Sequence, residues 1–127
     1  MVRPKASNQG SRHLSEHDLD RTFFALADST RRSVVELLRD RPRRAGELAE
    51  ELGSTPAGLS RHLRILRESG LVTEDALPDD ARVKIYRLER QCFEDLRSWI
   101  EDIETFWTGQ LESFKAHIER TRKKRTH

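Results

Sequence analysis

Apolar residues recur every three or four positions along the first half of this chain, a spacing typical of amphipathic helices. The pattern predicts a first helix that begins after Ser15 and ends near Ala27. Asp28 then caps a second helix over residues 29–39, and a third, shorter helix covers residues 45–52. We therefore expect the first part of the chain to be a set of short helices around one core.

The fourth predicted helix has the best-defined start in the chain. Thr55 is a favourable N-cap, and Pro56 follows at the first helical position, where its missing N–H costs nothing. Gly70 ends the helix. One side repeats leucine at four- and three-residue spacing and is expected to be buried: Leu59, Leu63 and Leu66. The opposite side is small and basic, and it consists of Ala57, Gly58, Ser60, Arg61, Arg64 and Arg67.

After this helix the period of the pattern changes to two, which indicates strands. Residues 71–73 begin the first strand, and residues 77–80 supply the turn of a hairpin. In the returning strand, Val83 and Ile85 alternate with Lys84 and Tyr86. We therefore expect a two-stranded ribbon directly after the fourth helix.

A single long helix is predicted from Arg90 to about residue 119. Its apolar positions step by threes and fours: Phe93, Leu96, Ile100, Ile103, Trp107, Leu111, Phe114 and Ile118. At 1.5 Å per residue such a helix is about 40 Å long, which is longer than the small domain before it can cover.

The composition fits one small globular domain. The 127 residues are 35% hydrophobic and 36% charged, enough for one modest core. No apolar run approaches the roughly 20 residues that cross a bilayer, and the N-terminus lacks the apolar segment of a secretory signal. Cys92 is the only cysteine, so no intrachain disulfide can form and a reducing compartment fits. These features predict a cytoplasmic protein.

The net charge of +2 is small, but its distribution divides the chain into segments. Residues 1–14 have a charge of +3 and are expected to be a disordered basic arm. Residues 15–119 form the predicted domain, in which the stretch 89–119 has a charge of −5. Residues 120–127 have a charge of +5 and are expected to be a basic tail.

The small and basic side of the fourth helix suits contact with DNA. Ala57 and Gly58 allow close approach of the backbone, and Arg61 has the geometry to bind the edge of a guanine. Arg64 and Arg67 are placed to hold phosphates. The alternative is an ordinary amphipathic helix with a solvated arginine side. Gly58 favours DNA contact, since a glycine inside a helix costs about 1 kcal/mol relative to alanine.

His62 lies at the edge of the buried side of the same helix, and two roles are open to it. One is a packing or hydrogen-bonding role at a helix–helix contact. The other is contact with a phosphate.

Four motifs follow one another through most of the chain. They are ALADSTRRSVVELL at residues 25–38, GELAEELG at 46–53, TPAGLSRHLRILRESGLV at 55–72 and VKIYRL at 83–88. Together they resemble the ArsR/SmtB family of bacterial repressors, over about residues 19–114. The resemblance implies a mainly α-helical winged helix-turn-helix fold with a small β-hairpin wing, which forms a homodimer through its first and last helices. It also implies binding to a palindromic operator in double-stranded DNA and release of that operator by an inducer.

The resemblance places the reading-helix positions on Pro56, Ala57, Ser60 and Arg61, with His62 and Arg64 beside them. Thr55 at the helix start and the basic residues Arg67, Arg82 and Lys84 complete the set expected to contact DNA. The expected dimer interface consists of Leu19, Phe23, Leu96, Trp99, Ile103, Phe106, Trp107, Leu111 and Phe114. Two-fold symmetry would then place two reading helices in successive major grooves.

Three positions depart from the family pattern. Ser29 replaces a proline, which is a mild change because serine is tolerated at a helix N-terminus. Arg44 stands where a serine or threonine cap usually precedes the third helix, so that helix is expected to fray or to be capped differently. The wing tip, residues 74–80, has a charge of −4 and no base. Because phosphates repel such a tip, we expect wing contacts from Arg82 and Lys84 only.

The sequence predicts no metal, no cofactor and no catalysis. The third helix has no cysteine for a thiolate site, and His117 alone on the last helix does not make a ligand set. Cys92 is expected to be a small packed residue rather than a redox switch. There is no glycine-rich phosphate loop and no nucleophile paired with a base. We therefore do not expect an enzyme.

Three functions compete at this point. The first is a dimeric repressor that binds a palindromic operator, often near its own promoter. The second is a sensor of the same fold, gated by a small molecule or by redox, in which Trp99, Phe106 and Trp107 would line a pocket. The third is a protein-interaction module that keeps the winged helix without binding DNA, supported by the acidic wing and the acidic last helix.

Overall fold

The structure is a computed structural model that describes residues 16–125. The basic arm predicted at residues 1–14 and the last two residues of the predicted tail lie outside the described residues. The chain divides into two compact units, the first ending at Asp95 and the second beginning at Leu96.

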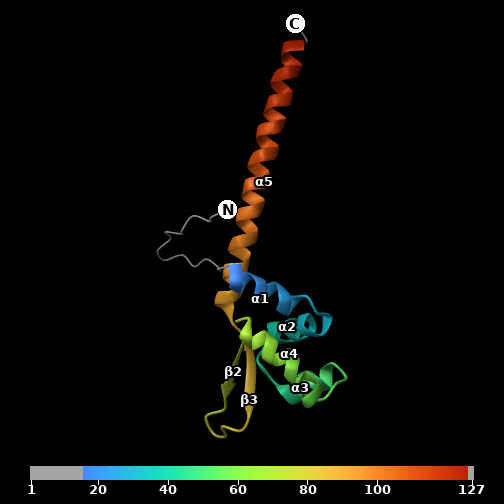
Figure 1. Cartoon of the computed structure of the whole chain (residues 1–127), viewed down its shortest axis with the longest axis vertical. Helices are drawn as coiled ribbons and strands as arrows, with labels where there is room; N and C mark the ends of the chain where they lie inside the picture. The colour runs from blue at the N-terminus through green and yellow to red at the C-terminus, as the bar shows by residue number, and fades with distance from the viewer. Residues whose placement is uncertain (1–15, 126–127) are drawn as a thin grey trace. The chain divides into compact units, whose positions relative to one another are not determined.

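Five helices and three strands make up the described part (Figure 1). The helices are α1 (Glu16–Leu26), α2 (Ser29–Asp40), α3 (Ala45–Glu51), α4 (Pro56–Glu68) and α5 (Arg90–Arg125). The strands are β1 (Arg43–Arg44), β2 (Val72–Ala76) and β3 (Lys84–Leu88). The first four helices therefore lie within two residues of the ends predicted from the apolar spacing.

Helix α4 lies at the centre of the first unit, in contact with α1, α2 and α3. Its three leucines are almost completely buried, as predicted. They join a core drawn from all five helices and from strands β2 and β3: Ala25, Val34, Leu38, Leu48, Ala49, Leu59, Leu63, Leu66, Leu71, Val72, Tyr86 and Cys92. Because one side of α4 is buried against three helices, its opposite side is held in a fixed orientation.

Two glycines in the left-handed region bracket α4. Gly53 has φ +64° and ends α3, where the N–H of Ser54 donates to the carbonyl of Ala49 over 2.8 Å. Gly70 has φ +87° and directly follows the last turn of α4. Any side chain at these two positions would strain the backbone, so the turns that set the length and direction of α4 depend on glycine.

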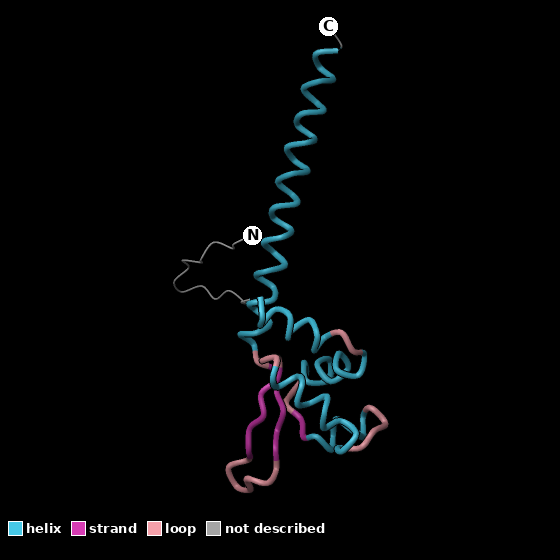
Figure 2. The backbone as a smooth tube through the Cα atoms, in the orientation of Figure 1, coloured by secondary structure: helices cyan, strands magenta, loops and turns pink. Residues whose placement is uncertain are grey.

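The three strands form one antiparallel sheet in the order β1-β3-β2 (Figure 2). Strand β1 was not predicted, because two residues are too short to show a period of two. It pairs Arg43 with Tyr86 and Arg44 with Ile85. Strand β3 begins at Lys84, so Val83 belongs to the turn rather than to the returning strand. The most buried side chain of β3 is Tyr86, at 7% exposure.

Helix α5 continues to Arg125, beyond the end predicted at about residue 119. Most of the predicted basic tail is therefore helical, because arginine and lysine are good helix formers and no glycine or proline interrupts the segment. The second unit consists of this helix from Leu96 onward, and several large apolar side chains along it are exposed: Ile100, Ile103, Phe106, Trp107, Leu111, Phe114 and Ile118.

Candidate nucleic-acid interface

The start of α4 is built as the sequence predicts. The hydroxyl of Thr55 accepts a hydrogen bond from the backbone N–H of Gly58 over 2.9 Å, which satisfies one of the free donors of the first turn. Pro56 occupies the first helical position. The helix therefore has a well-defined beginning with its positive dipole end at the surface.

The predicted DNA contacts of α4 lie together on its exposed side. Seven of them are exposed, Arg67 among them, and we call the other six the α4 surface: Thr55, Pro56, Ala57, Ser60, Arg61 and Arg64. The leucines of the same helix point to the core. The α4 surface thus has small and hydroxyl side chains at its start and two arginines further along, a composition that allows close approach to an anionic backbone.

Gly58 has a local reason for being glycine. A Cβ atom at this position would lie 2.8 Å from Oγ of Ser54 and 3.2 Å from Oγ1 of Thr55, the capping hydroxyl. The sequence argument that Gly58 favours DNA contact is therefore weakened, since the cap of the helix already explains it.

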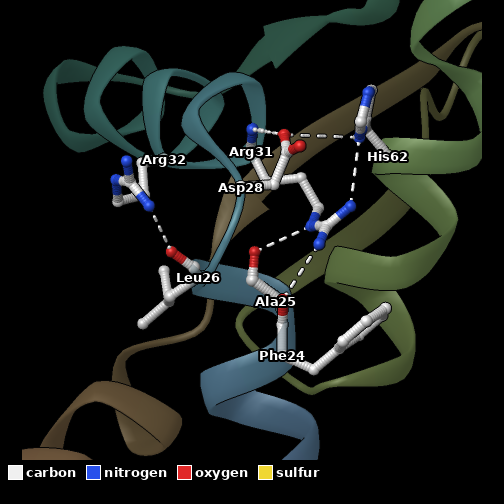
Figure 3. Close-up of polar contacts among 7 residues, drawn as sticks. All are labelled: Phe24, Ala25, Leu26, Asp28, Arg31, Arg32 and His62. Atoms are coloured by element: carbon white, nitrogen blue, oxygen red, sulfur yellow. Dashed lines mark hydrogen bonds and ion pairs between the residues drawn. The ribbon is translucent and has the colours of Figure 1, made fainter.

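His62 is half-buried and faces the turn between α1 and α2 (Figure 3). Its Nδ1 lies 3.3 Å from Nη1 of Arg31 and 3.8 Å from Oδ2 of Asp28. The hydrogen-bonding role that the sequence left open is therefore present in the structure. The other ring nitrogen, Nε2, points away from both partners in Figure 3.

Two neighbouring arginines of α2 close the end of α1. Arg31 donates from Nε to the carbonyl of Ala25 over 2.8 Å and from Nη2 to the carbonyl of Phe24 over 2.9 Å. Arg32 donates to the carbonyl of Leu26 over 2.8 Å. These are among the last carbonyls of α1, which have no partners inside the helix and favour a positive charge.

Arg31 is a residue that the sequence reasoning missed. It is only 7% exposed, and its guanidinium also lies 5.0 Å from the ring centre of Phe24. One feature of the sequence could have indicated this role. Arg31 lies in the first turn of the second helix, directly after the predicted end of the first, and an arginine near a helix C-terminus can bind its last carbonyls. Nothing in the sequence pattern indicates that the same side chain also reaches His62.

Asp28 caps α2, as predicted. Its Oδ2 accepts a hydrogen bond from the backbone N–H of Arg31 over 3.1 Å. That bond, with the positive charge of Arg31, holds the pKa of Asp28 below its ordinary value. The start of α3 is also capped, because the carboxylate of Glu47 accepts from the backbone N–H of Arg44 over 3.0 Å. Of the two outcomes predicted for α3, fraying or a different cap, the structure shows the different cap.

The wing is less acidic than the sequence indicated, because arginines pair with its carboxylates. Asp75 and Arg87 lie 2.8 Å apart across β2 and β3. Asp80 and Arg82 lie 3.1 Å apart in the turn, and this contact lowers the pKa of Asp80. The expectation of an uncompensated −4 tip counted residues 74–80 alone and is corrected by these partners.

Glu74 ties the wing to α4. It accepts a hydrogen bond from the hydroxyl of Tyr86 over 2.7 Å and lies 3.7 Å from the guanidinium of Arg67. Burial and the bond to Glu74 raise the pKa of Tyr86 to about 12. Arg67, predicted to hold a phosphate, is therefore shared with the wing.

The two predicted basic contacts of the wing differ in their surroundings. The side chain of Arg82 is 90% exposed but paired with Asp80. Lys84 is exposed and has no ion pair among the residues that the structure describes. Lys84 is thus the more accessible charge for an incoming phosphate.

The predicted dimer residues of α5 keep much of their surface open. Phe106 is 67% exposed, Trp107 61% and Phe114 62%, with Ile103 and Leu111 close to half exposed. Leu96 and Trp99 are half-buried, as is Leu19 of α1, whereas Phe23 of α1 is 42% exposed. Large exposed apolar side chains at helical spacing are typical of an interaction surface.

Among residues 16–125, no three side chains of the types that bind metals lie together. Within the same range no helix is long and apolar enough to cross a bilayer. Cys92 is buried, and burial raises the pKa of its thiol, which lowers its reactivity.

Comparison with known proteins places the chain among bacterial regulators. The family model described as "Bacterial regulatory protein, arsR family" matches residues 28–74. The HTH-type transcriptional regulator Rv2034 of Mycobacterium tuberculosis is 36% identical over 100 residues, which cover 79% of this chain and 88% of the relative. The transcriptional repressor SdpR of Bacillus subtilis is 26% identical over 82 residues, covering 65% of this chain and 88% of the relative.

A solved structure matches the fold as well. The ArsR-like transcriptional regulator from Rhodococcus sp. RHA1 superimposes with a TM-score of 0.69 at 25% sequence identity. The match covers 81% of this chain and 92% of that chain.

Proposed function

Because this chain belongs to the arsR family of bacterial regulatory proteins, transcriptional regulators with a winged helix-turn-helix, we propose that it is a dimeric repressor of a palindromic operator. The B. subtilis relative is a repressor by name, which supports the direction of regulation. We place the protein in the cytoplasm, where DNA is accessible and Cys92 stays reduced.

The α4 surface is the single observation on which this proposal depends. Its small residues stand at the capped N-terminus, where free N–H groups and the helix dipole favour a phosphate oxygen. Ser60 and Arg61 follow on the same exposed side and have the reach to bind base edges in a major groove. Arg64 and the wing residue Lys84 supply further phosphate contacts.

Dimerisation is proposed through α1 and α5. The exposed apolar positions of α5 are too many for a monomer surface, and a second copy of the helix would bury them. A two-fold dimer presents two α4 surfaces related by the same symmetry, which matches a palindromic site.

The competing functions are weighed by the same geometry. The protein-interaction module depended on an acidic wing, and the pairing of wing carboxylates with arginines removes part of that support. A small-molecule inducer stays a prediction, which titration of the intrinsic fluorescence of Trp99 and Trp107 with candidate metabolites would test.

The substitution Arg61→Ala tests the reading role of α4. We expect it to weaken binding to the specific operator by about 1–3 kcal/mol and to change binding to random DNA little, because the guanidinium contacts bases. The measurement is fluorescence anisotropy with both DNA sequences at one fixed salt concentration, starting from the DNA upstream of the protein's own gene.

Arg39→Ala is the matched control. Arg39 is an exposed arginine at the end of α2 that pairs with Asp40, so its loss removes the same charge away from the α4 surface. An equal loss of affinity for both DNA sequences in Arg61→Ala would show that Arg61 does not read bases. No binding of any DNA at low salt would overturn the proposed function.

A further inference from the structure

We propose that Arg31 is a positioning residue for DNA binding, which fixes the tautomer of His62 so that Nε2 donates a hydrogen bond to a DNA phosphate. The inference rests on the proposed function, because the acceptor is a phosphodiester oxygen bound beside the α4 surface. Arg31 itself is buried and does not touch the DNA.

The guanidinium of Arg31 is held in one orientation. Its Nε and Nη2 donate to the carbonyls of Ala25 and Phe24, over 2.8 and 2.9 Å. These two bonds leave Nη1 directed at His62, 3.3 Å from Nδ1 (Figure 3). Because the side chain is buried and its Nε and Nη2 are bonded to backbone carbonyls, it cannot turn away from the imidazole without losing those bonds.

The chemistry of the two groups then decides the position of the ring hydrogen. A guanidinium has only donors, whereas a neutral imidazole has one donor and one acceptor nitrogen. Nδ1 must therefore accept from Arg31, and the hydrogen of the neutral ring is on Nε2.

Asp28 is the competing partner of Nδ1. Its Oδ2 would stabilise a hydrogen on Nδ1, but it lies 3.8 Å away and already accepts the backbone N–H of Arg31 at 3.1 Å. The shorter contact to Arg31 therefore determines the tautomer.

The donor that results stands where DNA is expected. His62 follows Arg61 on α4 and keeps 26% of its side chain exposed. It also lines a hollow of about 280 Å³ between the starts of α2 and α4, together with the hydroxyl side chains of Ser29, Thr30, Ser33 and Ser54. Such neutral donors bind phosphate oxygens in protein–DNA complexes.

The tautomer of His62 is measured first, in the free protein. Two-dimensional ¹H–¹⁵N spectra of the imidazole at about pH 8 distinguish a protonated from an unprotonated Nδ1, and His62→Phe assigns the signals by their loss. We expect an unprotonated Nδ1 in the native chain and a mixture of tautomers in Arg31→Met. A protonated Nδ1 in the native chain, or an unchanged tautomer in Arg31→Met, would overturn the role of Arg31.

Arg32→Met is the matched control. It removes the same charge from the next position of α2 and a bond to the same end of α1, but Arg32 does not reach His62. We expect it to leave the tautomer unchanged, which separates the effect of the His62 contact from loss of charge or of the helix end.

A double-mutant cycle then connects the tautomer to DNA binding. We expect Arg31→Met to weaken operator binding in the native background by the inverse of the fraction of His62 that keeps its hydrogen on Nε2, about 10-fold when a tenth remains. In the His62→Phe background the same substitution should change binding less than about 2-fold. Equal losses in both backgrounds would show that Arg31 acts through something other than His62.

The two levels of the proposal fail in different ways. No DNA binding by the native chain would overturn the proposed function and the phosphate contact with it. Operator binding with the wrong tautomer of His62 would overturn only the role of Arg31. If Arg31→Met does not fold, the tautomer of the native chain and the affinity of Arg31→Lys, whose ammonium lacks the planar fork, decide the question.

Discussion

Gly58 lies beside the α4 surface, but the N-terminal cap of its own helix is sufficient to explain why it is a glycine. The hydroxyls of Ser54 and Thr55 occupy the space that a Cβ atom at position 58 would enter. Glycine inside a helix costs about 1 kcal/mol relative to alanine, so the cap is maintained against an unfavourable propensity.

The substitution Gly58→Ala tests this reading in two backgrounds. In Ser54→Ala, which lacks the nearer hydroxyl, we expect Gly58→Ala to stabilise the fold by about 0.5–1 kcal/mol through helix propensity. With Ser54 intact the gain should be smaller, because Oγ must move. Urea unfolding measures both, and an equal gain in the two backgrounds would contradict the role of Ser54.

Asp28 gives the fold a dependence on acid. Its pKa is lowered in the folded chain from the ordinary 3.8, mainly by the bond from the N–H of Arg31. A group with a lowered folded pKa stabilises the fold above its unfolded pKa, and that contribution is lost as the pH falls through the folded value. Asp28→Asn, which can still cap a helix, should therefore lose less stability than the native chain as the pH falls below about 4.

Urea unfolding at neutral and at acidic pH measures this difference. Glu47 and Asp80 also have lowered pKa values and remain in the variant, so part of the acid dependence should persist. An acid dependence identical to that of the native chain would show that Asp28 contributes nothing.

The caps at Asp28 and Thr55 could be predicted because each acts on a backbone N–H three residues away. The role of the Arg31 side chain could not, because its partners come from two separate segments, the end of α1 and the middle of α4. From the periodicity of an amphipathic helix, an arginine is predicted to be exposed to solvent. Only the tertiary packing shows that Arg31 is buried.

At the scale of elements, helices were predicted more accurately than the sheet. A helix leaves a pattern over ten or more residues, whereas β1 has two residues and leaves none. The charge of the wing was also misjudged, since the pairs Asp75–Arg87 and Glu74–Arg67 depend on strand register and on the approach of α4 to β2. Neither can be read from residues 74–80 alone.

The wing offers a test through its two basic side chains. Lys84→Ala should weaken binding to operator and to random DNA alike and reduce the slope of log affinity against log salt by about 1, as for loss of one phosphate contact. Asp80→Asn should strengthen binding at low salt, because Arg82 is released from its partner. Arg87→Ala, an arginine held by Asp75, is the control and should change the slope less.

Anisotropy titrations over a range of salt concentrations measure these slopes. A slope that Lys84→Ala leaves unchanged would show that the wing does not touch the phosphates.

At the scale of the whole molecule, α5 has more apolar surface than its own unit covers. The exposed side chains follow one another at helical spacing from Ile100 to Ile118. Placing this surface in water costs roughly 25 cal/mol for each Å² left uncovered, which favours burial against a second copy.

Trp107→Glu tests whether this surface forms the dimer. A charge at an interface position should weaken self-association by at least about 100-fold, because an aromatic anchor is lost and a carboxylate is buried without a partner. Operator affinity should fall with it, since one copy contacts only half of the palindrome. Sedimentation velocity and operator binding are the measurements.

Thr108→Glu is the matched control, because it adds the same charge at the next position, away from the apolar spacing. We expect it to remain a dimer. A dimer that persists in Trp107→Glu would place the interface elsewhere.

The pairing of β1 with β3 has a consequence for how the domain folds. Arg43 and Arg44 lie before α3, and their partners Tyr86 and Ile85 lie after the wing, so α3, α4 and the hairpin are enclosed in one loop of chain. Contacts between α3 and α4 and between β2 and β3 join near neighbours in sequence and can form early, whereas the β1–β3 pairing must wait for the whole loop to close. The start of α3 and the wing are therefore joined by the pairing of the sheet that is most distant in sequence, and we expect this pairing to form last.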